Sequence, residues 1–161
     1  MQPIIESVRR SSFEDVNCSV AQFLEVAGDW WTMLIVRDAF FGVTRFSDFQ
    51  RRLGVARNIL ADRLDWLVSH GVFSQREYQP GRSDYVLTDK GRDLWLVLTA
   101  MRQWGDRWHA EAGPPVEMIH KGCGHVAQAV VVCSACGEAL DGRDVRVQLG
   151  PGATDDSLLP L

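Results

Sequence analysis

The chain has 161 residues, of which 46% are hydrophobic and 24% charged, and its net charge is −4. No apolar run approaches the roughly 20 residues of a membrane helix, and the N-terminus lacks the long apolar core of a secretory signal. We therefore expect a soluble cytoplasmic protein with one core and an appendage. In that compartment the four cysteines are expected to be reduced, metal-bound or redox-active rather than structural disulfides.

The N-terminal third of the chain predicts a polar arm and two helices. Residues 1–16 form the arm, and residues 17–27 repeat apolar positions with a helical period. Gly28 is expected to end this first helix. Asp29 is expected to cap a second helix that runs to about Phe41.

Two shorter helices separated by a tight turn are predicted next. Ser47 and Gln50 form a capping-box pattern, which predicts that one helix starts at Ser47 and stops near Gly54. A further helix is predicted for residues 56–70, with Gly71 as its left-handed terminator.

A polar-tipped hairpin follows these helices. Residues 72–78 and 83–87 are β-prone, and the Pro-Gly pair between them predicts a tight turn. Helix, turn, helix and hairpin in this order are typical of a winged helix-turn-helix, so the predicted fold is mainly α with a small β wing. Residues 45–92 carry nine basic and six acidic side chains, so this stretch can bind the phosphates of duplex DNA although the whole chain is acidic.

Helix-turn-helix proteins insert the first turns of their second helix into the major groove. The candidates for contact with base edges are therefore Arg57, Asn58 and Ala61. The candidates for phosphate contact are Arg51, Arg52 and Arg63 on the helices and Arg76 and Arg82 on the hairpin. Solvated surface charge is the alternative for each of these arginines.

A long helix is predicted to follow the wing, from its cap at Thr88 to about residue 112. An apolar seam runs along it at i, i+4, i+7 and i+11, formed by Val97, Met101, Trp104 and Trp108. This seam either packs inside its own subunit or faces a second one. Residues 17–113 thus form the predicted DNA-binding and dimerisation domain.

Six short motifs between Cys18 and Trp108 carry a family resemblance. They are Cys18 itself, Gly28 with Trp31-Thr32, residues 45–49 (RFSDF), residues 60–64 (LADRL), Gly71-Val72 and residues 85–91 (YVLTDKG). Together they resemble the HxlR family of bacterial winged-helix transcription regulators, distant relatives of the MarR type. The resemblance implies a homodimer that places two recognition helices on a pseudo-palindromic operator, with half-sites about 10 to 10.5 bp, or a multiple, apart.

The resemblance also implies a regulator, expected to be a repressor, that responds to a small molecule or to redox state. Some family members sense electrophiles or oxidants through a cysteine at the position of Cys18, and a thiol near a helix N-terminus suits that chemistry. A half-buried cysteine that acts only as a small hydrophobe is the alternative.

Two positions depart from the family pattern. Ser19 stands where members usually have Pro, and Asp29-Trp30 where they usually have Gly-Lys. Adjacent Trp30 and Trp31 point about 100° apart on a helix, so they cannot fill the same core site. One of them is expected to pack at the dimer interface or to line a ligand cavity.

Pro114-Pro115 mark a boundary, and residues 114–149 are predicted to form a small β module resembling a zinc ribbon. It contains two ligand pairs at the spacing of zinc knuckles, His120 with Cys123 and Cys133 with Cys136, each pair followed by glycine. A closed, structural zinc site with these four ligands is predicted, with His125 as the alternative donor; free or disulfide-bonded cysteines are the other reading. Residues 150–161 are expected to be a flexible tail.

No enzyme is predicted. Pairing Cys18 with His109 or His120 as nucleophile and base has no supporting motif, and no phosphate loop or open metal site is recognisable. The alternative to a DNA-binding regulator is a winged-helix module that binds another protein without sequence-specific DNA binding.

Overall fold

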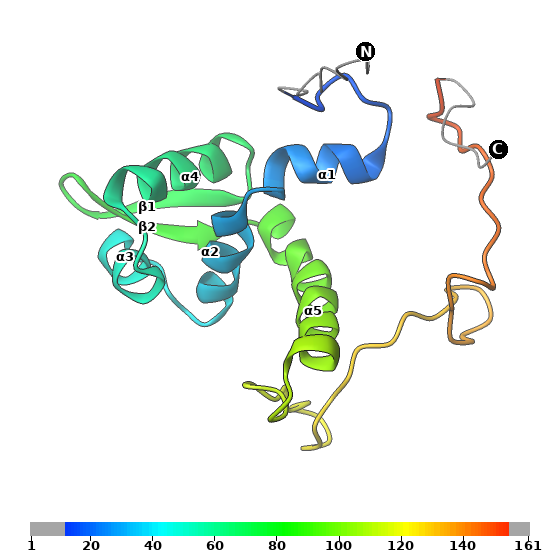
Figure 1. Ribbon diagram of the computed structural model, residues 1–161. Helices are drawn as coiled ribbons and strands as arrows, with labels where there is room; N and C mark the ends of the chain where they lie inside the picture. Colours follow the sequence, from blue (N-terminus) through cyan, green and yellow to red (C-terminus); the bar gives the residue numbers. More distant parts are fainter. Residues whose placement is uncertain (1–11, 155–161) are drawn as a thin grey trace, which may run out of the picture.

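The computed structural model describes residues 12–154, so most of the predicted arm and the end of the predicted tail lie outside the described residues. Figure 1 shows the described elements in chain order: α1 (Ser19–Ala27), α2 (Trp30–Phe40), α3 (Phe46–Leu53), α4 (Arg57–Ser69), β1 (Phe73–Gln79), β2 (Arg82–Leu87) and α5 (Asp89–His109). The predicted fold class, mainly helical with a two-stranded wing, is confirmed. None of the described helices has the length and apolar character needed to cross a bilayer.

One core lies between α2, α3, α4 and the base of the hairpin. We call this part of the chain, residues 30–87, the head. Its fully buried apolar side chains are Ile35, Val36, Phe49, Leu60, Leu64 and Leu67, with Val72 and Phe73 at the base of β1. The rings of Phe49 and Phe73 meet edge to face at 6.4 Å, so α3 is packed directly against the wing.

Most predicted helix boundaries are confirmed within one or two residues. The predicted N-cap of α2, Asp29, and the predicted terminator of α4, Gly71, are confirmed as well. The Asp29 carboxylate accepts a hydrogen bond from the Trp31 backbone amide at 2.9 Å and caps α2. Gly71 has a left-handed φ of 70° just after α4, where a side chain would be strained.

The predicted capping box at the start of α3 is wrong. The helix begins at Phe46, its N-cap is Arg45, and no side chain caps it. An isolated β-bridge between Arg45 and Asp84 holds the chain extended up to Arg45, so the helix begins before Ser47 and that hydroxyl lies inside the first turn. A tertiary contact therefore sets this boundary.

The wing is an antiparallel pair in which Phe73 lies opposite Leu87 and Gln79 lies opposite Arg82. Pro80 and Gly81 form its tip, and Gly81 has a φ of 71°, as the Pro-Gly turn requires. The amide of Tyr85 also donates to the Thr44 carbonyl at 2.7 Å. This contact and the neighbouring Arg45 bridge attach the chain before α3 to the wing, a pairing that the sequence reasoning missed.

The junction between α4, the wing and α5 is tightly bonded. The Thr88 hydroxyl donates to the Gly71 carbonyl at 2.6 Å and accepts from the Gly91 amide at 3.1 Å, which confirms Thr88 as the cap of α5. Lys90 donates to the His70 carbonyl at 2.9 Å. The end of α4 is thereby fixed to the start of α5.

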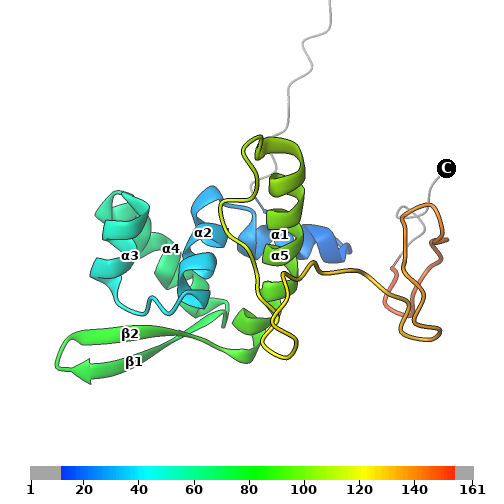
Figure 2. The same ribbon diagram turned by 90° about the horizontal axis from the view of Figure 1, so that it is seen from below.

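The chain beyond α5 differs from the predicted β module. Up to residue 154 it contains two isolated bridges, Ile119 with Val126 and Val132 with Ala139, and no strand. Each bridge closes a local turn, so the β-prone valines between the turns have no partner strand. The segment ends beside the N-terminal region, where Asn17 bonds to the backbone of Gly152 and Thr154 at 3.1 and 3.3 Å (Figure 2).

Candidate nucleic-acid interface

The N-terminal end of α4 forms an open surface next to α3. Gly54, with a φ of 62°, turns the chain between the two helices, and the buried stripe of α4 faces the head. Arg57 and Asn58 are consequently exposed and Ala61 is half-buried. The structure thus brings the predicted base-contacting residues together on one outward face.

Arg57 is positioned by an aromatic ring. Its guanidinium carbon lies 5.0 Å from the centroid of the Phe46 ring at the start of α3. Among residues 12–154, no acidic side chain comes within ion-pair distance of Arg57 or of Arg82 at the tip of the wing. Their charges are therefore uncompensated locally and available to an anionic ligand.

The three predicted phosphate contacts on the helices have different surroundings. Arg51 is exposed and pairs with Asp48 at 2.7 Å one turn earlier on α3. Arg63 is half-buried and lies 3.6 Å from Asp29, the cap of α2. Of the three, only Arg51 has its acidic partner on its own helix.

Arg52 reaches a buried carboxylate. Asp38 on α2 is 0% exposed, and it accepts hydrogen bonds from Arg52 at 3.2 Å and from Arg37 at 2.9 Å. A buried carboxylate is costly unless charged donors surround it, so Arg52 fixes α3 against α2. Helical periodicity does not reveal this pair, because Asp38 and Arg52 lie on different helices.

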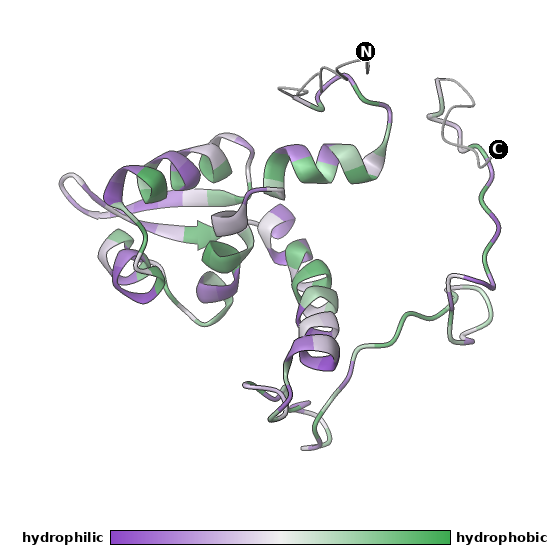
Figure 3. Cartoon of the chain, in the orientation of Figure 1, coloured by the Kyte–Doolittle hydropathy of each residue, from purple (hydrophilic) through white to green (hydrophobic). Residues whose placement is uncertain are grey.

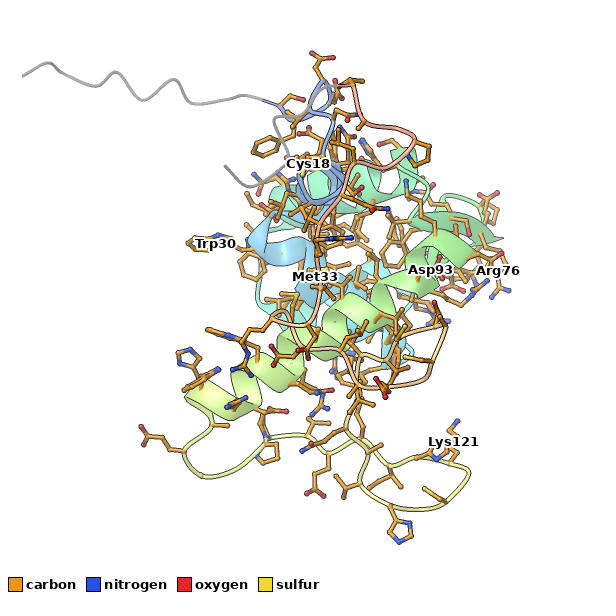
Figure 4. The ribbon with its side chains drawn as sticks, turned by 90° about the vertical axis from the view of Figure 1, so that its right-hand side faces the viewer. Cys18, Trp30, Met33, Arg76, Asp93 and Lys121 are labelled. Atoms are coloured by element: carbon orange, nitrogen blue, oxygen red, sulfur yellow. The ribbon has the colours of Figure 1, made fainter. Side chains whose placement is uncertain are left out.

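The wing carries a second group of cations. Arg76 is exposed and 3.7 Å from Asp84, and Figure 4 shows it at the edge of the molecule. Asp84 also lies 3.9 Å from Arg45, whose guanidinium stands 5.0 Å from the centroid of the Tyr78 ring. Arg45 is an interface candidate that the sequence reasoning missed; its place directly before α3 was the available signal.

Cys18 lies away from this surface, at the N-cap of α1. Its side chain is half-buried and makes no capping hydrogen bond. It lines an open groove of about 1000 Å³ between the start of α1 and the C-terminal segment, together with Asn17, Val147, Leu149 and Gly152. The thiol is accessible from this groove.

The predicted metal ligands form two separate pairs. Nδ1 of His120 lies 3.2 Å from Sγ of Cys123. The backbone amides of Cys136 and Ala135 and the Cys136 thiol donate to Cys133 and lower the pKa of its thiol. Figures 1 and 2 place the yellow and orange segments that carry the two pairs apart, and no three potential ligands meet within the described residues.

The predicted seam on α5 is uncovered in a single subunit. Met101, Trp104 and Trp108 are 51%, 61% and 61% exposed. Figure 3 shows hydrophobic residues in the upper and middle turns of α5, and paler to hydrophilic residues toward its far end. Trp30 is also exposed and projects from the body in Figure 4, whereas Trp31 packs against the core. The adjacent tryptophans diverge, as helix geometry predicts.

Two helices joined by a glycine turn, a wing, and exposed arginines on both define a winged helix-turn-helix protein. Comparison with known proteins places it more narrowly. Residues 26–112 match the HxlR-like helix-turn-helix model, and the chain belongs to the HxlR family. It is therefore a DNA-binding transcriptional regulator and not an enzyme.

Relatives agree with this assignment over more than the DNA-binding domain. An uncharacterized HTH-type transcriptional regulator of Mycobacterium tuberculosis, Rv3095, is 42% identical over 137 residues, which cover 83% of this chain and 87% of the relative. PA1607, a candidate transcription factor of known crystal structure, is 42% identical in sequence to this chain. The match covers 84% of this chain and 97% of PA1607, and the two structures superpose with a TM-score of 0.77. The redox regulator HypR in its oxidized form is 27% identical to this chain. The match covers 56% of this chain and 95% of HypR, with a TM-score of 0.51.

Proposed function

We propose that the protein is a homodimeric repressor that binds a pseudo-palindromic operator and inserts the N-terminal end of α4 into the major groove of each half-site. The exposed, locally uncompensated Arg57 at that end carries the proposal. Arginine can donate two hydrogen bonds to guanine, and Asn58 beside it suits adenine. Ala61 is one turn further along the same face and suits a thymine methyl group.

Phosphate contacts are assigned to the cations on either side of α4. Arg51 flanks it on α3, and Arg76 and Arg82 extend beyond it on the wing. Arg52 and Arg63 contribute with the parts of their guanidinium groups that Asp38 and Asp29 leave free. Phosphate contacts of this kind position the protein but carry no sequence preference.

A binding titration tests these roles. The full-length protein selects a duplex from a random pool, and fluorescence anisotropy compares that duplex with a scrambled one over a range of salt concentrations. Arg57→Ala should lose about 5- to 150-fold of the discrimination between the two duplexes. Arg51→Ala should weaken both complexes alike and reduce the salt slope by about 1.

Two results would reject the DNA assignments. Equal weakening of both duplexes by Arg57→Ala would assign that side chain to the backbone rather than to a base. Binding without a steep salt dependence would favour the protein-interaction alternative, because counterion release accompanies phosphate contacts. Repression is tested with the selected duplex placed across a reporter promoter, whose output should fall when the protein is supplied and rise again with Arg57→Ala.

The dimer is proposed to form through the seam on α5. Two tryptophans more than half exposed on one helix are unfavourable in water, and packing them against a second copy removes apolar area from solvent. Trp104→Glu should yield monomers in sedimentation velocity. Phe41→Glu changes an aromatic residue of similar exposure in the head and serves as the control. A dimer unaffected by Trp104→Glu would reject this interface.

Regulation is proposed to act through Cys18, by oxidation or by a small electrophile. Support comes from its accessible groove and from the likeness to HypR, a redox regulator. Oxidant or electrophile should change operator affinity in the titration above, and a thiol reductant should reverse the effect of oxidant. If Cys18→Ser protein responds just as the wild type does, the proposal is wrong.

A further inference from the structure

The chain beyond α5 contains the same turn twice, thirteen residues apart. The first turn spans residues 120–125 and the second spans residues 133–138. In the first turn, the backbone amide of His120 donates to the carbonyl of His125 at 2.9 Å. The amide of Gly124 donates to the carbonyl of His120 at 2.8 Å. In the second turn, the amide of Cys133 donates to the carbonyl of Glu138, and the amide of Gly137 donates to the carbonyl of Cys133. Both distances are 2.8 Å.

Glycines give both turns the same shape. Gly124 and Gly137 occupy corresponding positions and have left-handed φ angles of 74° and 78°. A β-bridge closes each turn at corresponding positions, Ile119 with Val126 and Val132 with Ala139. The repeat therefore includes backbone conformation as well as sequence spacing.

Each turn brings two metal-ligating side chains to one point. The Nδ1 to Sγ separation of 3.2 Å in the first turn is close to the value of about 3.5 Å expected for two ligands on one tetrahedral zinc ion. Gly122 leaves room for the imidazole, because a Cβ there would lie 3.0 Å from Cε1 of His120. One turn thus supplies half of a tetrahedral site.

The turns have no hydrophobic core of their own. Cys123 and Cys136 are exposed, and Val130 and Val131 between the turns are 74% and 71% exposed. A module of under about 40 residues usually needs a metal, disulfides or a partner to hold its shape. Burial therefore does not account for cysteines at these positions.

The segment between the two turns is bonded to α5. The side-chain amide of Gln103 on α5 accepts from the Ala129 amide at 2.8 Å and donates to the Ala129 carbonyl at 3.0 Å. Ala129 lies midway between the turns, so these two bonds attach the connecting segment to α5 in the arrangement where the ligand pairs lie apart. A second copy can supply the half-site that one chain does not bring to the other.

We propose that the protein binds zinc between subunits, with His120 and Cys123 of one protomer and Cys133 and Cys136 of its partner as ligands to each ion. Two-fold symmetry then gives a dimer two identical sites. With four protein ligands each site is closed and structural, and it cross-links the extensions of the two subunits. The inference rests on the homodimer of the proposed function.

Zinc content tests the ligand set. Full-length protein purified without added metal should contain about one zinc ion per chain, and Cys133→Ser should lose it. Cys18→Ser replaces the remaining cysteine and should keep the zinc. His120→Ala should lose it while His125→Ala retains it. Wild-type protein with no more zinc than Cys133→Ser protein would overturn the proposal.

Mixed dimers test whether the site is shared between subunits. One protomer carries His120→Ala and Cys123→Ser, the other carries Cys133→Ser and Cys136→Ser, and differently tagged copies are co-expressed. The doubly tagged heterodimer should hold one zinc ion, and neither homodimer should hold any. A heterodimer without zinc would reject the shared site, and zinc in either homodimer would mean that like turns pair.

Sedimentation velocity of the same samples distinguishes failure of the metal site from failure of the proposed dimer. A dimeric wild type without zinc refutes the metal site and leaves the proposed dimer intact. A monomeric wild type refutes the dimer, and with it the shared site. Cobalt(II) substitution gives an independent readout, because thiolate ligation in a tetrahedral site produces characteristic visible and near-ultraviolet bands.

Discussion

The head buries a core of apolar side chains, whereas the chain beyond the middle of α5 leaves most of its large apolar side chains exposed. In the head, Phe49, Leu60 and Leu64 are completely buried, and a single chain closes that core. Beyond it, Trp104 and Val130 are 61% and 74% exposed. The DNA-reading unit therefore has a core that one chain closes, whereas by our proposals a second subunit and a metal cover and fix the remainder.

The largest expected effect comes from opening the core of the head. Leu60→Ala should lower the free energy of unfolding by about 2–5 kcal/mol, because it removes a fully buried side chain and leaves a cavity. Val130→Ala is the matched change in the extension and should stay within about 0.5 kcal/mol. Urea unfolding measures both. Equal losses would break the comparison, and a Val130 effect that grows with protein concentration would show that a partner covers this residue.

A smaller loss is expected where α5 leaves the head. A Cβ added at Gly91 would clash with the Val72 carbonyl oxygen and would lie 2.9 Å from the Leu87 side chain. Gly91→Ala must therefore displace the start of α5, at a cost of about 1–3 kcal/mol. Thermal unfolding should show a fall of several degrees. An unchanged melting temperature would mean that α5 is not held rigidly at this point.

The smallest expected effect is a gain in the middle of α5. At Gly105 an added Cβ would meet nothing within 4 Å in a single subunit, so Gly105→Ala should stabilise the helix by about 0.5–1 kcal/mol. Unfolding below the dimer dissociation constant measures this gain. At higher concentration, weaker association of the variant would show that Gly105 allows close approach of the partner helix. Destabilisation of the monomer would contradict the exposed state of this face.

Local signals were sufficient for most of the head. Asp29, Gly71 and the Pro80-Gly81 turn each act within a few residues, so the sequence alone located the helix ends and the hairpin. Ser47 failed as a cap because the pairing of the preceding chain with the wing moved the start of α3, and a local pattern carries no information about such a pairing.

The interface could be predicted only in outline. Periodicity placed Arg57 on the outer face of α4. It did not distinguish Arg51, which pairs with Asp48 on its own helix, from Arg52, which bonds to a carboxylate on another helix. The prediction of a β module was wrong because it too depended on a contact that local sequence does not specify. Valine-rich segments predict strands by composition, yet a strand also requires a partner, and the described single chain offers none.

The bonded junction at Thr88 gives α5 a mechanical role. Thr88 and Lys90 attach its first turn to the carbonyls of Gly71 and His70, so the start of α5 is anchored to the end of α4. A helix of this length, Asp89–His109, extends about 30 Å, so a tilt of about 5° at one end displaces the other by about 2.6 Å. In the proposed dimer, an adjustment of the α5 angle would change the distance between the two α4 helices, and the pitch of DNA would set how much of that change binding tolerates.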